Sequence, residues 1–107
     1  MIFWTHLHRT RQAGLSRRAT IRITGDVDRS DIAALDVLGA DLQRMGHVHI
    51  DLSGVGYSGT SLATWLIDQQ RAQDEVGGHL TVGHVPKQLE RLLRDLGHER
   101  TLGGPTP

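Results

Sequence analysis

Segments with strand-like alternation and segments with helical periodicity take turns along this chain, which limits the folds open to it. Residues 47–52 place Val48, Ile50 and Leu52 at every second position, as in a strand with one buried face, and residues 53–59 are expected to form a linker. Residues 60–75 then repeat apolar side chains at helical spacing, and residues 79–85 resemble another strand. Strands joined through a helix pair in parallel with a right-handed crossover. We therefore expect an α/β fold, with a small mixed β-sheet covered by three to four helices.

Two strands are expected before the first helix. Residues 1–10 alternate in character, and residues 20–24 are rich in β-branched side chains. Residues 12–18 contain glycine and serine and are typical of a hairpin loop. Gly25 is expected to end the second strand.

Helix boundaries are marked by capping residues and glycines. Asp28 or Ser30 can cap the first helix, which is expected to end at Gly46. Pro86 is well placed to begin the last helix, and Gly97 to end it. The predicted element order is therefore β-β-α-β-α-β-α.

The length of 107 residues fits one domain. We expect a single domain over residues 1–107, with its core at about 20–102, an N-terminal strand and hairpin at 1–19 and a frayed tail at 103–107. The net charge is zero and the chain has no cysteine, so thiol chemistry is excluded. No apolar run has the length of a bilayer span and no signal peptide is visible, so a cytoplasmic location is expected.

Several arginines precede the first acidic residue, Asp26, and they are Arg9, Arg11, Arg17, Arg18 and Arg22. Such a basic segment can bind nucleic acid or an acidic protein surface. It can also be a solvated edge whose charges prevent strands from aggregating. No aromatic or glycine-rich pattern is interleaved with the arginines, so we favour the solvated edge and expect no nucleic-acid partner.

Sequence patterns of common catalytic sites are missing from the chain. It contains neither a Walker A loop nor GxGxxG, and Gly59-Thr60-Ser61 does not match the nucleophile elbow GxSxG. We therefore expect no catalytic residues, no cofactor and no autonomous enzyme activity.

Two histidine pairs have the spacing that places both imidazoles on one face of a strand. These pairs are His6 with His8 and His47 with His49. If their two strands were neighbours, four imidazoles would converge, as a zinc or nickel site requires. No cysteine or compelling acidic ligand accompanies them, so we expect no functional metal site.

The segment YSGTS lies at a strand-to-helix junction and concentrates hydroxyl groups there. Ser58 or Thr60 can cap the unsatisfied N–H groups of the helix, and Gly59 relaxes the turn. The same geometry suits a phosphorylation switch, because a phosphate at a helix N-terminus is tolerated by its own fold.

The string VHIDLSGVGYSGTSLATWLIDQQRAQDEVGGHLTVGHVPKQLERLLRDLG resembles STAS domains, in particular bacterial anti-sigma-factor antagonists. Their pattern is a strand ending in D-L-S-x-V, an aromatic residue, and D-S-[ST]-G-L at a helix start. A Gly-Gly turn, a strand and a last helix that begins with V-P follow. Gly25-Asp26-Val27-Asp28 is similar to the family's G-x-[LV]-D, and the resemblance covers about residues 20–102.

The resemblance implies a non-enzymatic protein-binding switch. In this family, the antagonist binds an anti-sigma factor that is also a serine/threonine kinase of the histidine-kinase-like ATPase type, and binding releases the sigma factor. The kinase phosphorylates the antagonist on the first hydroxyl of D-S-[ST]-G, which weakens the complex, and a phosphatase restores it.

The resemblance places the family's acid at Gly59, its phosphorylated serine at Thr60, the next hydroxyl at Ser61 and its glycine at Leu62. We expect phosphorylation at Thr60, with Ser61 and Ser58 as fallback acceptors. Gly59 and Leu62 depart from the pattern, so the sequence supports binding better than phosphorylation. The expected partner-binding residues are Asp26, Asp28, Tyr57, Ser58, Gly59, Thr60, Ser61 and Leu62.

An alternative role is compatible with the same fold. STAS accessory subunits of lipid or anion transport systems dock on a membrane protein and need no phosphorylation. The incomplete acceptor pattern around Thr60 motivates this alternative.

Overall fold

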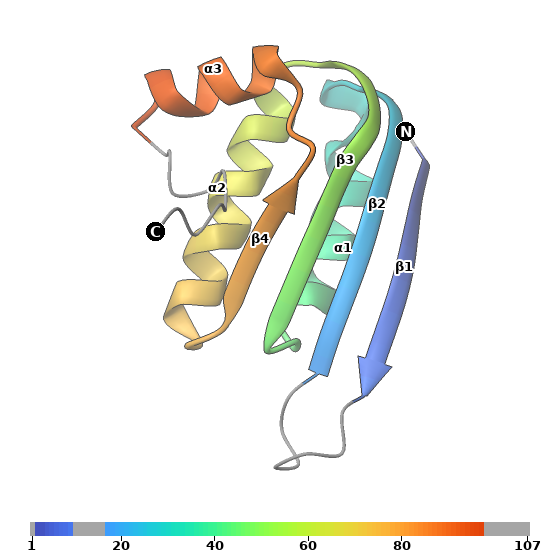
Figure 1. Ribbon diagram of the computed structural model, residues 1–107, viewed down its shortest axis with the longest axis vertical. Coiled ribbons are helices and arrows are strands. Elements are labelled where there is room, and N and C mark those ends of the chain that lie inside the picture. The colour runs from blue at the N-terminus through green and yellow to red at the C-terminus, as the bar shows by residue number, and fades with distance from the viewer. Residues whose placement is uncertain (1, 10–16, 98–107) are drawn as a thin grey trace.

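The computed structural model describes residues 2–9 and 17–97, with side chains from Arg18 onward. Its elements are, in chain order, β1 (Ile2–Arg9), β2 (Arg17–Val27), a short 3-10 helix (Arg29–Asp31), α1 (Ile32–Leu42), β3 (His47–Ser58), α2 (Thr60–Glu75), β4 (His79–Gly83) and α3 (Lys87–Asp95). This sequence of elements confirms the predicted order (Figure 1). Most of the predicted hairpin loop and the whole predicted tail lie outside the described residues.

The strands form one mixed sheet with the spatial order β1-β2-β3-β4. β1 runs antiparallel to β2, whereas β2, β3 and β4 run parallel to one another. The predicted mixed sheet is therefore confirmed. Because the three parallel strands point the same way, their carboxyl ends share one edge, and α3 lies beside that edge in Figure 1.

The neighbour relations separate the two histidine pairs. β2 lies between β1, which carries His6 and His8, and β3, which carries His47 and His49. The strands that carry the two histidine pairs are therefore not neighbours, so the pairs do not come together as a four-imidazole site would require.

β2 does not end at Gly25, as the sequence predicted, but continues to Val27. Gly25 has a φ of 83°, and the pairing with β3 shifts register between Gly25 and Val27. A glycine in this conformation is typical of a β-bulge, which lets a strand bend without ending. The extra residues of β2 carry Asp26 to the carboxyl edge of the sheet.

β3 is also longer than predicted, because the expected linker after Leu52 remains extended as far as Ser58. Its glycines permit close packing against β2. A Cβ atom on Gly54 would lie 2.5 Å from Cγ2 of Thr24, its register partner. The extension of β3 delivers Tyr57 and Ser58 directly to the start of α2.

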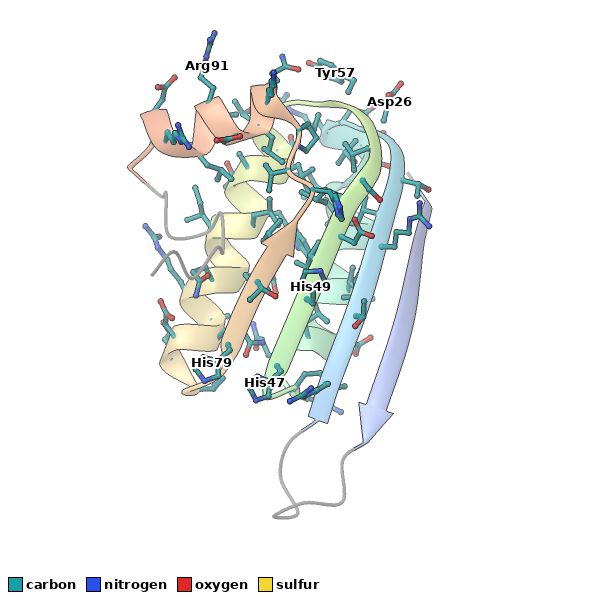
Figure 2. All side chains as sticks on the ribbon, in the orientation of Figure 1. Asp26, His47, His49, Tyr57, His79 and Arg91 are labelled. Atoms are coloured by element: carbon teal, nitrogen blue, oxygen red, sulfur yellow. The ribbon has the colours of Figure 1, made fainter. Side chains whose placement is uncertain are left out.

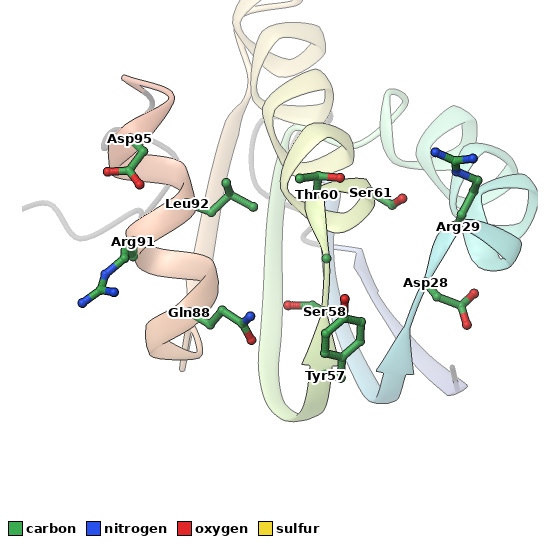
Figure 3. A pocket seen from close by; sticks show the side chains of 11 residues that line it. Asp28, Arg29, Tyr57, Ser58, Thr60, Ser61, Gln88, Arg91, Leu92 and Asp95 are labelled. Atoms are coloured by element: carbon green, nitrogen blue, oxygen red, sulfur yellow. The ribbon is translucent and has the colours of Figure 1, made fainter.

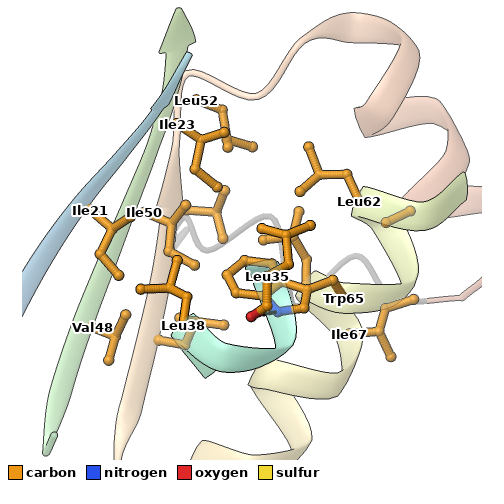
Figure 4. Packing of buried hydrophobic residues seen from close by; sticks show 14 of the residues in the cluster. Ile21, Ile23, Leu35, Leu38, Val48, Ile50, Leu52, Leu62, Trp65 and Ile67 are labelled. Carbon is orange, nitrogen blue, oxygen red and sulfur yellow. Dashed lines mark hydrogen bonds between the residues drawn. The ribbon is translucent and has the colours of Figure 1, made fainter. Parts of the chain in front are cut away.

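One face of the sheet is buried, because α1 and α2 lie behind it in Figure 1. Alternate residues of the strands point into this layer, among them Ile21, Ile50 and Leu52, and the apolar stripes of the helices meet them (Figure 4). Trp65 is buried as well, and its Nε1–H donates a 2.8 Å hydrogen bond to the carbonyl of Leu35. Each large apolar side chain buried in this way contributes about 1.5–3 kcal/mol.

The entry to α1 follows the predicted capping by Asp28. Its Oδ1 accepts a 2.8 Å hydrogen bond from the backbone N–H of Ser30, and Oδ2 of Asp31 accepts one of 2.9 Å from the N–H of Asp28. This reciprocal capping box starts the 3-10 helix, which leads into α1. Ser30 is not the cap, because its hydroxyl bonds to Asp28 instead.

Candidate functional site

A depression of about 510 Å³ lies at the carboxyl edge of the sheet, where β3 passes into α2. Its lining comes from three parts of the chain, within residues 28–29, 57–61 and 88–95. The lining residues are Asp28, Arg29, Tyr57, Ser58, Gly59, Thr60, Ser61, Gln88, Arg91, Leu92 and Asp95. Figure 3 shows the strand-to-helix junction between α3 on one side and Asp28 with Arg29 on the other. We call this surface the carboxyl-edge depression.

The start of α2 has no side-chain cap. Its N-cap residue is Gly59, in extended backbone with φ −101° and ψ −162°, and no side-chain capping hydrogen bond is formed there. The prediction that Ser58 or Thr60 caps this helix is therefore wrong. The first N–H groups of α2 keep their capacity to bind, and the positive end of the helix dipole lies at the depression.

The hydroxyl groups of the junction differ in their exposure. Thr60 is exposed and Ser61 is partly exposed, whereas Ser58 is only 4% exposed. Thr60 is therefore accessible to another protein at this junction, whereas Ser58 is not. Leu62 is fully buried in the core, which accounts for a bulky residue at this position.

Tyr57 carries the largest apolar surface of the predicted set, and it is 55% exposed. Its backbone N–H donates a 2.8 Å hydrogen bond to Oδ1 of Asp26, which fixes the end of β3 against the end of β2. Asp26 itself does not line the depression but supports the residue that does. An exposed tyrosine on rigid backbone suits contact with another protein, because it adds area at low entropic cost.

Asp28 lines the depression as a carboxylate. The hydrogen bond from the Ser30 hydroxyl, followed by that from the Ser30 backbone N–H, lowers its pKa below the usual value. Asp28 therefore contributes a negative charge to the rim at neutral pH.

Five lining residues were missed by the sequence analysis, and they are Arg29, Gln88, Arg91, Leu92 and Asp95. Four of them belong to α3. In Figure 3, Gln88 and Leu92 point from α3 toward the junction, whereas Arg91 points away from it. The sequence predicts the last helix and its polar side. It does not predict that this helix packs beside the start of α2.

Within the described part of the chain, no group of three or more histidine, cysteine or acidic side chains is arranged to hold a metal ion. His47 and His79 stack on each other at the other end of the sheet. No helix among the described residues combines the length and the apolar character needed to cross a bilayer.

Comparison with known families decides what kind of domain this is. The family model described as "Mlab, STAS domain" matches residues 10–103, which is most of the chain. The chain belongs to the STAS-domain family. The resemblance predicted from the sequence is thereby confirmed, and the carboxyl-edge depression is a surface of a STAS domain.

Solved structures share the STAS fold at low sequence identity. The unphosphorylated anti-sigma factor antagonist SpoIIAA matches with a TM-score of 0.64 and 10% identity, over 85% of this chain and 82% of that one. The phosphorylated form of SpoIIAA, the Bacillus cell fate determinant, matches with a TM-score of 0.67 and 11% identity, over 91% and 86% of the two chains. An anti-sigma factor antagonist from Mycobacterium paratuberculosis matches with a TM-score of 0.60 and 17% identity, over 98% and 87%. A search of curated proteins returns no match.

Proposed function

We propose that this STAS domain is a non-enzymatic regulator that acts in the cytoplasm as an anti-sigma-factor antagonist. It binds an anti-sigma factor through the carboxyl-edge depression, and binding releases the sigma factor. The observation that carries the proposal is the position of Tyr57 and Thr60, both exposed at the depression on the strand-to-helix junction. Similarity in fold to anti-sigma factor antagonists supports it.

The depression has the mixed chemistry of a protein interface. Tyr57 and Leu92 offer apolar area, and charges of both signs surround them on Asp28, Arg29 and Asp95. Interfaces of this kind gain affinity from a few aromatic and apolar anchors, whereas the polar rim fixes the partner and its orientation. Ser58 and Leu62 are buried, so we leave their side chains out of the proposed contact surface.

Phosphorylation of Thr60 is the proposed switch, and the proposed partner is a kinase of the histidine-kinase-like ATPase type. Transfer of the γ-phosphoryl group of ATP to Oγ1 of Thr60 releases ADP and the hydroxyl proton, and it adds about two negative charges at the centre of the surface. The lining holds two acids, Asp28 and Asp95, and two arginines, Arg29 and Arg91. A phosphate therefore makes a balanced set of charges negative and repels an acidic partner group. The free N–H groups at the start of α2 tolerate the phosphate, which leaves the fold intact.

The experiment mixes the purified protein with candidate anti-sigma kinases of the same genome, with and without ATP. Complex formation is measured by titration calorimetry, and the modified residue is located by mass spectrometry. We expect a complex that ATP weakens and a phosphate on Thr60. Failure to bind any of these kinases would reject the function.

Two charge variants test whether Thr60 is the switch. Thr60→Glu should weaken the complex at least tenfold, which corresponds to about 1.4 kcal/mol, whereas Thr60→Ala should bind like the unmodified protein. Ala40→Glu adds the same charge at an exposed position of α1 outside the depression and should leave affinity unchanged. Equal affinity of the two Thr60 variants would rule out Thr60 as the switch while leaving the binding function standing.

A second candidate function is an accessory subunit of a lipid or anion transport system. The observation that favours it is the local departure at Gly59 and Leu62, which leaves the surface suited to binding but removes the family's acceptor pattern. A pull-down from native cells separates the two functions. Recovery of a transporter component with the membrane fraction supports the accessory subunit, and recovery of an anti-sigma kinase supports the antagonist.

A further inference from the structure

Basic side chains gather at the end of the sheet opposite to the carboxyl-edge depression. Arg18, His47 and His79 are register partners across β2, β3 and β4. They alternate with buried residues, so their side chains lie on the sheet face that the helices leave open. Figure 2 shows His47 and His79 together at the starts of β3 and β4, at the other end of the molecule from Tyr57.

The histidines are held in a defined arrangement. The rings of His47 and His79 stack with centroids 5.1 Å apart and planes at 22°. In the neighbouring row, Nδ1 of His49 lies 2.7 Å from Oγ1 of Thr81. These rows border a shallow depression of about 250 Å³, which we call the histidine depression, and its lining residues are Arg18, Ala19, Thr20, His47, Val48, His49, His79 and Thr81.

The ionisable groups of this lining, one arginine and three histidines, are all basic. The next carboxylate on the same side of β3 belongs to Asp51, which already has interaction partners of its own. Its Oδ1 accepts a 2.9 Å hydrogen bond from the N–H of Ser53 and lies 3.3 Å from Nδ1 of His84. No acidic side chain therefore balances the charge of the histidine depression within its lining.

Charged groups on the elements packed around the histidine depression do not make it acidic. Asp74 and Glu75 end α2, which packs against the other face of the sheet (Figure 1). On the side of β1, the backbone register pairs His8 with Arg18 and His6 with Thr20. Those two histidine side chains lie outside the described residues.

We propose that the histidine depression binds a phosphate-type oxyanion, either free phosphate or the phosphate group of a small metabolite. The Arg18 guanidinium matches such an anion through paired N–H donors. The imidazoles of His47 and His79 and the hydroxyl of Thr20 offer further donors in the same lining. A divalent cation fits less well, because Arg18 is the register partner of His47 and repels positive charge.

The test is a titration of the isotope-labelled protein with inorganic phosphate at constant ionic strength, followed by amide and imidazole NMR signals. Glycerol phosphate, a phosphomonoester, serves as a second probe. The anion that binds more tightly shows whether the ligand is free phosphate or the phosphate group of a small metabolite. We expect saturable shifts at residues 18–20, 47–49 and 79–81. The variants Arg18→Gln and His79→Gln should weaken binding about tenfold.

The matched control is Arg22→Gln, which removes an exposed arginine from the same strand outside the histidine depression. It should leave phosphate affinity unchanged. Shifts that do not saturate, shifts confined to the start of α2, or equal affinity of the Arg18 and Arg22 variants would overturn the proposal. Because the site lies away from Tyr57 and Thr60, none of these results bears on partner binding.

Discussion

The backbone N–H of Tyr57 donates its hydrogen bond to a carboxylate that lies 31 residues earlier in the chain, Oδ1 of Asp26, at 2.8 Å. This contact joins the end of β3 to the end of β2 beside the carboxyl-edge depression. A Cβ atom on Gly56 would come within 2.8 Å of the same oxygen, so the close approach depends on a glycine there. An exposed aspartate thereby positions the exposed tyrosine that we propose as the anchor for the partner.

Replacing Asp26 with alanine should loosen this junction. We expect Asp26→Ala to lower the free energy of unfolding by about 1 kcal/mol, because the N–H of Tyr57 loses its acceptor. Amide hydrogen exchange at Tyr57 should become faster, and urea unfolding gives the stability change. Asp26→Asn keeps an acceptor oxygen and should retain most of the stability. An equal loss in both variants would show that the hydrogen bond is not what stabilises the junction.

An acidic residue in place of Gly59 should stabilise the N-terminus of α2. Gly59 is the N-cap residue, has extended backbone and lacks a capping side chain. We expect Gly59→Asp to stabilise the protein by a few tenths of a kcal/mol, through capping and the helix dipole. Thermal unfolding measures the change. The same variant restores the acid of the family pattern, so phosphorylation of Thr60 should become faster, and an unchanged rate would show that this acid does not assist the kinase.

Gly54 is the position where added volume should cost most in the sheet. A Cβ atom there would lie 2.5 Å from Cγ2 and 3.0 Å from Cβ of Thr24, a short side chain that cannot swing away. We expect Gly54→Ala to destabilise the protein by about 1–3 kcal/mol in denaturant unfolding. Gly59→Ala is the matched control, because its nearest contact would be an ordinary 3.5 Å to Oη of Tyr57. Similar stability of the two variants would contradict the predicted clash.

Asp51 should titrate below its usual pKa of 3.8. The largest cause is the hydrogen bond from the backbone N–H of Ser53, and the Ser53 hydroxyl and the nearby His84 also lower the pKa. Since folding depresses this pKa, the stabilisation is present above the unfolded value and is lost as the pH falls through the folded value. Carbon NMR of the carboxyl group should show this low pKa.

His84→Ala separates the causes of the Asp51 shift. The pKa of Asp51 should rise only slightly in this variant, because the Ser53 N–H remains. A return to 3.8 would mean that His84, rather than the backbone, sets the charge of Asp51.

Local sequence patterns are sufficient to predict which strands and helices form. They predict the ends of the strands less accurately. The span of α2 and the capping role of Asp28 were both predicted from the sequence and are confirmed. β2 and β3 extend beyond the ends that the sequence predicts, because Gly25 and the glycines after Leu52 are typical of strand breaks. Pairing with a neighbouring strand kept these segments extended, and such pairing cannot be inferred from one segment alone.

For this protein, the sequence by itself determined the order of strands and helices, the STAS resemblance and the hydroxyl-rich junction around Thr60. These features depend on contacts within a few residues, which local spacing and capping control. Only the tertiary structure decided that α3 brings Leu92 to that junction, that Ser58 is buried, and that Arg18 lies in one row with His47 and His79. Those relations join residues far apart in the chain, and strand order and helix packing set them.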